Sequence, residues 1–108
     1  IEKEYAPLYE KHGLGTTIWS LLTGGILGGK YNTEIPEGTR LAQKDNAFWI
    51  KAAAGLQTPE LLAEKLGATV AQLALAWTIT NPNVSAVITG ATKVSQVTEN
   101  LKALQIVN

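Results

Sequence analysis

The stretch Val84–Thr92, VSAVITGAT, decides the fold class of this chain. Its first six residues form a short apolar run typical of a buried strand, and Gly90 separates this run from a helical pattern. Upstream, Thr16–Ser20 (TTIWS) is a second run rich in β-branched and aromatic residues. Helical patterns lie between these runs and after them. Strands that alternate with helices predict an α/β fold with parallel strands.

The N-terminal half combines one short helix with a glycine-rich stretch. Apolar residues recur at helical spacing over residues 1–12, Pro7 predicts a break near Ala6, and Gly13 is placed to cap the helix C-terminus. Residues 21–38 carry five glycines and one proline, which predicts a loop. Residues 39–57 are ambiguous, with a helical turn as one reading of the alanines at 52–54.

The C-terminal half carries clear helix signals. The order Thr58-Pro59-Glu60 predicts a helix start, and Gly67 predicts its end. Thr69 and Gln72 form a capping box for the next helix, which Asn81-Pro82 stops. The predicted buried stripe of that helix is Val70, Leu73, Ala74 and Trp77, and the apolar stripe of the last helix is Val94, Val97, Leu101 and Leu104.

Composition excludes several classes of protein. The 108 residues suffice for one domain at most, and nine basic residues balance nine acidic ones, which argues against a dedicated nucleic-acid binder. The absence of cysteine excludes disulfides and thiolate metal sites, and a single histidine excludes a multi-histidine cluster. The longest weakly polar run, residues 16–29, is too short to cross a bilayer. With no methionine, the chain reads as a piece of something longer or as a processed product.

Two patterns suggest ligand chemistry. Residues 24–31, GGILGGKY, match a phosphate-binding P-loop except that Tyr31 replaces the small hydroxyl residue, which leaves a flexible loop or another kind of phosphate loop as readings. Thr92, Gln96, Glu99 and Asn100 share one face of the last helix. The preceding ITGAT junction aims backbone N–H groups at one spot, which indicates an anion site. The alternative reading of this polar stripe is a solvated surface.

The sequence closely resembles the C-terminal part of aldo-keto reductases, in the branch of voltage-gated potassium channel β subunits. The resemblance is carried by WSLLTGGILGGKY, GTR, AQLALAW, NPNVSAVITGAT and QVTEN, and it covers nearly the whole chain. It implies a (β/α)₈ barrel that binds NADP(H) at the C-terminal ends of its strands. A full barrel takes about 250 residues, so residues 1–108 form a single partial domain. They are expected to supply strands seven and eight with their helices, which makes an incomplete barrel.

The resemblance also implies cofactor-binding residues. These are the strand-seven residues Trp19, Ser20 and Leu22, the loop residue Gly25, the phosphate-contacting pair Lys30 and Arg40, the strand-eight turn residues Gly90 and Thr92, and the residues around the 2′-phosphate and adenine, Gln96, Glu99 and Asn100. Three features depart from the family. Leu21 stands where proline is usual, Gly28 replaces a threonine or serine, and the segment 40–56 is shorter than usual.

The family's catalytic aspartate, tyrosine, lysine and histidine lie on early strands that this chain does not match. We therefore expect no catalytic residue and no metal in these 108 residues, and no activity of the chain alone. Two functions follow as expectations. One is the NADP(H)-binding part of a carbonyl reductase, and the other is a non-enzymatic piece that self-associates or binds a partner. The resemblance adds a potassium channel α subunit as a partner, and the absence of targeting signals indicates the cytoplasm, without nucleic-acid binding or membrane insertion.

Overall fold

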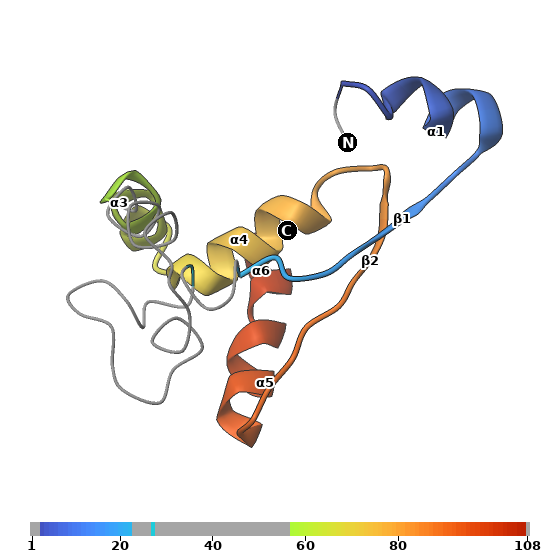
Figure 1. The fold of residues 1–108 in the computed structure, drawn as a ribbon. Helices are drawn as coiled ribbons and strands as arrows, with labels where there is room; N and C mark the ends of the chain where they lie inside the picture. Colours follow the sequence, from blue (N-terminus) through green and yellow to red (C-terminus); the bar gives the residue numbers. More distant parts are fainter. Residues whose placement is uncertain (1–2, 23–26, 28–56, 108) are drawn as a thin grey trace, which may run out of the picture.

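A computed structural model of the chain describes residues 3–22, 27 and 57–107. Within these ranges the elements follow in the order α1 (Ala6–His12), β1 (Thr16–Ile18), α3 (Gln57–Lys65), α4 (Val70–Ile79), β2 (Val84–Val87), α5 (Val94–Leu101) and α6 (Ala103–Val107). Figure 1 traces this order from the N-terminal helix to the C-terminal pair. The glycine-rich motif 24–31, apart from residue 27, and the alanines 52–54 lie outside the described residues.

β1 and β2 form a parallel pair, as the alternation of strands and helices predicts. Thr16 pairs with Val84 and Ile18 with Val87, with an irregularity after Thr16. The Thr16 backbone N–H and hydroxyl both donate to the carbonyl of Asn83, at 3.1 and 2.6 Å, and fix the start of the ladder. Both strands are shorter than the apolar runs that predicted them. The described part is thus an α/β unit with an open two-stranded sheet.

The predicted C-terminal glycine caps of α1 and α3 are present, whereas the predicted N-terminal cap Thr58 lies inside α3. α1 begins at Ala6 beside Pro7, and Gly13 ends it in the left-handed conformation with φ 63°, its N–H donating to the carbonyl of Tyr9. α3 begins at Gln57, one residue before the predicted cap, and Gly67 has φ 64° after its end. The N–H of Gly67 donates to Glu64 and that of Ala68 to Ala63, a Schellman arrangement that satisfies the last carbonyls of the helix.

The predicted capping box of α4 is formed on both sides. The Gln72 N–H donates to the Thr69 hydroxyl at 3.1 Å, and the Thr69 N–H donates to Gln72 Oε1 at 3.0 Å. α4 ends at Ile79, just before Asn81-Pro82. These two signals fix both ends of the helix that packs against β2, α3, α5 and α6.

The predicted buried face of α4 is wrong. Gln72, Leu75 and Ala76 are the buried residues, whereas Trp77 is 69% exposed. Apolar residues surround α4 on nearly every side, so its sequence does not select which face meets the core. A small core forms around Leu75, Ala76 and Ala103, joined by the partly buried residues Leu21, Val87 and Ile106.

The last predicted helix is interrupted. α5 ends at Leu101, Lys102 lies between the helices, and α6 begins at Ala103, which is buried against α4. The apolar stripe of α5 does not enter a core, since Val94 is 84% exposed and Leu101 is 60% exposed. Within the described part of the chain, this stripe therefore faces outward.

Candidate functional site

The C-terminal ends of the two strands meet at one edge of the sheet. Ile18 pairs with Val87, and the N–H of Ile88 donates to the carbonyl of Ile18 at 2.8 Å. Trp19 and Ser20 follow β1, while Gly90 and Thr92 follow β2. Because the strands are parallel, these predicted site residues leave the same edge. In barrel enzymes this edge carries the active site.

The residues after β1 present an exposed ring beside a sharp backbone turn. Trp19 is 76% exposed. Ser20 is the only described residue other than glycine with a positive φ, at 57°. A side chain in this region of backbone space costs about 1–3 kcal/mol, and such residues are concentrated at functional sites. Leu22 is half-buried, and its carbonyl accepts from the N–H of Leu27 at 3.1 Å.

The donors at the start of α5 are bound by a side chain of the same helix, Gln96. Gln96 Oε1 accepts from the N–H of Thr92 at 2.8 Å, from the Thr92 hydroxyl at 3.3 Å and from the N–H of Lys93 at 3.2 Å. The sequence predicted free N–H groups here, and the structure shows two of them already satisfied. Their convergence on one oxygen nevertheless marks a point where three donors meet. An anion would reach these donors by displacing the Gln96 side chain.

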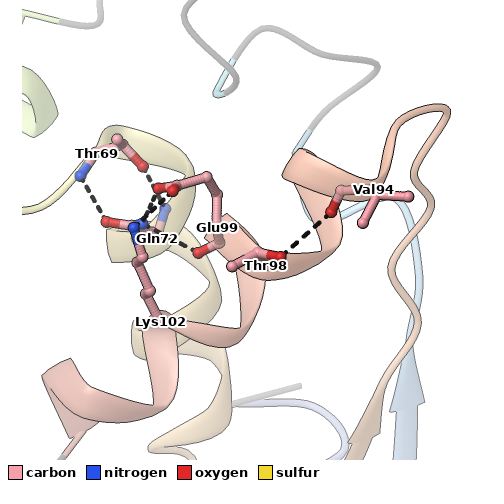
Figure 2. Close-up of polar contacts among 6 residues, drawn as sticks. All are labelled: Thr69, Gln72, Val94, Thr98, Glu99 and Lys102. Atoms are coloured by element: carbon pink, nitrogen blue, oxygen red, sulfur yellow. Dashed lines mark hydrogen bonds and ion pairs between the residues drawn. The ribbon is translucent and has the colours of Figure 1, made fainter.

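Glu99 belongs to a second polar cluster, the Gln72–Glu99 network, formed by Thr69, Gln72, Glu99 and Lys102 (Figure 2). Gln72 Nε2 donates to the main-chain carbonyl of Glu99 and to its Oε2, both at 3.0 Å. Lys102 Nζ lies 2.6 Å from Glu99 Oε1. The carboxylate of Glu99 is therefore directed at the beginning of α4 (Figure 2).

The remaining predicted residues divide into two groups. Asn100 is half-buried on α5, next to Glu99. Gly25, Lys30 and Arg40 lie outside the described residues.

The hydrogen bonds from Gln72 to Glu99 were not predicted from the sequence. The sequence assigned Gln72 to a cap, and no local spacing signals a contact between residues 27 positions apart.

Two kinds of feature are absent from the part of the chain that the structure describes. Among residues 3–22, 27 and 57–107, no group of three or more His, Asp or Glu side chains is arranged to hold a metal ion. Within the same ranges, no helix combines the length and apolar character needed to traverse a bilayer.

The sequence profile of the Aldo/keto reductase family matches residues 1–108. The chain belongs to that family.

Proteins similar to this chain occur in a fungus and in plants. It is 45% identical to the "Putative voltage-gated potassium channel subunit beta" of Schizosaccharomyces pombe, across 99% of this chain and 33% of the relative. It is 44% and 43% identical to proteins named "Probable voltage-gated potassium channel subunit beta" in Arabidopsis thaliana and Oryza sativa, each across 99% of this chain and 35% of the relative. The chain therefore spans about a third of the length of these relatives.

The aligned region is longer than this chain in these matches. The match to the Schizosaccharomyces pombe protein extends over 119 residues, more than the 108 of this chain. The relative thus has residues within the matched region that this chain lacks.

Proposed function

We propose that this chain is the C-terminal, NADP(H)-binding part of an aldo-keto reductase barrel, with β1 and β2 as strands seven and eight. One observation carries the proposal. The paired ends of the two parallel strands bring Trp19 and Ser20 to the same edge as Gly90 and Thr92. A ligand lying across this edge would contact the exposed indole ring on one side and the beginning of α5 on the other.

The preference for NADPH follows from charge. The 2′-phosphate is the only large difference in charge between NADPH and NADH. The resemblance assigns two cations, Lys30 and Arg40, to the phosphate groups. The donors at Thr92 and Lys93 favour an anion at the start of α5. The resemblance assigns Gly25 to the loop that covers the pyrophosphate. Gln96 and Asn100 add neutral hydrogen-bonding groups on the same helix.

The chemistry that the cofactor supplies is hydride transfer to the carbonyl of an aldehyde or ketone. The residues of this chain bind and orient the dinucleotide. We place the family's catalytic tetrad, including the tyrosine that donates a proton to the carbonyl oxygen, on strands outside these 108 residues. The proposal also locates the protein in the cytoplasm, with a potassium channel α subunit as a candidate partner in line with the names of its relatives.

Binding of NADPH and NADH, followed by quenching of tryptophan emission, tests the proposal. Trp19 is the expected reporter because it is exposed at the sheet edge. Hydrogen bonds to charged groups contribute about 1.5–3 kcal/mol, so Arg40→Ala should weaken NADPH binding about tenfold or more and leave NADH nearly unchanged. Lys11→Ala, which removes an exposed cation on α1, is the matched control and should change neither. Equal affinity of the unmutated protein for both cofactors, or binding of neither, would refute the proposal.

A second candidate function is favoured by the surface. Fourteen large apolar side chains are exposed among the described residues, against five apolar residues that are buried, three of them alanines. Apolar surface of this extent on one chain marks an interaction site. The alternative is therefore a non-enzymatic piece of the barrel that self-associates or binds a partner. In that case the apolar stripe of α5 would be covered while neither nucleotide binds.

A further inference from the structure

Gln72 is the one polar residue buried among the described residues, with 6% of its surface exposed. Its side-chain oxygen accepts from the Thr69 N–H at 3.0 Å, which fixes the orientation of the amide. Its Nε2 therefore faces α5 and donates to both the main-chain carbonyl and the Oε2 of Glu99, each at 3.0 Å. Every hydrogen-bonding group of this amide is engaged, and two of its bonds end on the same residue.

A helix cap alone does not require this arrangement. The capping box of α4 uses only Gln72 Oε1 and its backbone N–H. The two Nε2 bonds hold the backbone of Glu99 and also select the rotamer of its side chain. The other carboxylate oxygen, Glu99 Oε1, accepts no hydrogen bond from Gln72 and instead pairs with Lys102 Nζ at 2.6 Å. Both side chains are about half exposed, Glu99 at 49% and Lys102 at 51%.

We propose that Gln72 is a positioning residue for the adenine end of the cofactor site. It holds Glu99 through Oε2, so that Oε1 is presented as the acceptor for the 6-amino group of the purine. Lys102 occupies Oε1 in the structure described here, and the amino group replaces it on binding. An exposed ion pair contributes only about 0–1 kcal/mol, so this exchange is cheap. The inference rests on the proposed function, because it assigns the adenine end of the same site.

The test compares NADPH with its hypoxanthine analogue, which carries an oxygen in place of the 6-amino group. A hydrogen bond to a charged acceptor discriminates by about tenfold or more, so the unmutated protein should prefer NADPH by about that factor. Gln72→Leu releases Glu99 and should bring the ratio of the two affinities close to one. A merely structural role for Gln72 would weaken both ligands equally and leave the ratio unchanged.

Thr69→Ala is the matched control. It removes the hydroxyl that accepts from the Gln72 N–H at the same helix end, but keeps both bonds from Nε2 to Glu99. It should therefore lower stability while the ratio of affinities stays at the unmutated value. Loss of discrimination in Thr69→Ala as well would overturn the assignment to Gln72, because general loosening of α4 would then be sufficient.

If Gln72→Leu does not fold, Gln72→Glu takes its place, because it keeps the capping oxygen and loses both Nε2 donors. Lys102→Met, on an exposed residue, tests the exchange at Oε1. Removing the competitor for Oε1 should raise the preference for NADPH over the analogue, by up to about fivefold. An unchanged ratio in Lys102→Met would overturn the exchange at Oε1. Discrimination that persists in a folded Gln72→Leu would overturn the role of Gln72 alone. Binding of neither nucleotide by the unmutated protein would instead refute the proposed function, and this inference with it.

Discussion

Gly15 immediately precedes β1 at a place where the backbone passes close to Ser85 of β2. A Cβ added at Gly15 would collide with the Ser85 hydroxyl and lie 3.2 Å from the Ser85 Cβ. The strand cannot easily move away, because Thr16 donates twice to the carbonyl of Asn83, at 3.1 and 2.6 Å. Gly15→Ala should therefore strain the beginning of the parallel ladder.

Two opposing terms set the magnitude. Inserting a methyl group into an occupied space costs about 1–3 kcal/mol. Replacing glycine by alanine also restricts the unfolded chain, which favours folding by about 0.4–1 kcal/mol where the native backbone accepts a side chain. Gly15 does not require a positive φ. We thus expect Gly15→Ala to lower the free energy of unfolding by about 1 kcal/mol.

The decisive measurement is the same substitution in a Ser85→Gly background. Ser85 is exposed, and removing its side chain leaves the new methyl group nothing to collide with. There Gly15→Ala should turn from destabilising to neutral or stabilising, a reversal of sign in the free energy of unfolding measured by urea denaturation. Equal destabilisation in both backgrounds would refute the reasoning from close approach. NADPH affinity should not change in any of these variants, because Gly15 lies at the opposite end of β1 from Trp19.

Three other predictions concern the site and the surface. The 108-residue chain should reduce no aldehyde with NADPH, because general acid catalysis needs a positioned proton donor, and turnover that exceeds a heat-treated control and survives repurification would contradict this. The chain should self-associate through the apolar stripe of α5 and through the outer edges of β1 and β2, which pair with no further strand among the described residues, so sedimentation that shows a compact monomer at micromolar concentration would count against it. Ser20→Gly should stabilise the fold by about 1 kcal/mol, because glycine accepts the φ of 57° without strain. The same substitution should weaken NADPH binding, because the hydroxyl is lost. Unchanged thermal stability would show that the backbone at Ser20 carries no strain.

Local signals in the sequence predicted most of the elements correctly. Caps depend on a few adjacent residues, so the glycines at 13 and 67 and the pair Thr69 and Gln72 could be assigned without knowledge of the rest of the fold. The parallel pairing followed from the order of strands and helices. The edge that carries Trp19 and Thr92 followed in turn from that pairing, because both residues come just after a strand.

Packing and hydrogen-bond partners could not be predicted in the same way. α4 is apolar on nearly every side, so helical periodicity could not choose between the face with Trp77 and the face with Leu75. The sequence predicted the polar stripe of α5, but it did not predict the hydrogen-bond partner of each donor and acceptor in that stripe. Gln96 turns back onto its own helix start, and Glu99 is held by a residue 27 positions away. Such partners depend on tertiary placement, which spacing along one helix does not encode.

The polar residues of α5 also constrain the energetics of cofactor binding. Thr92 and Lys93 already donate to Gln96, and Glu99 already accepts from Gln72 and Lys102. A nucleotide that uses these groups must replace hydrogen bonds that already exist, so each new bond contributes less net free energy than it would at a group without a partner. Affinity must then come mainly from groups without an internal partner to give up. The exposed face of Trp19 is one such group and offers apolar contact. Separately, the resemblance assigns Lys30 and Arg40 to the phosphate groups, where charge-assisted bonds would add affinity. It follows that removing Trp19 should weaken NADPH and NADH alike, whereas the difference between the two cofactors resides in the cations.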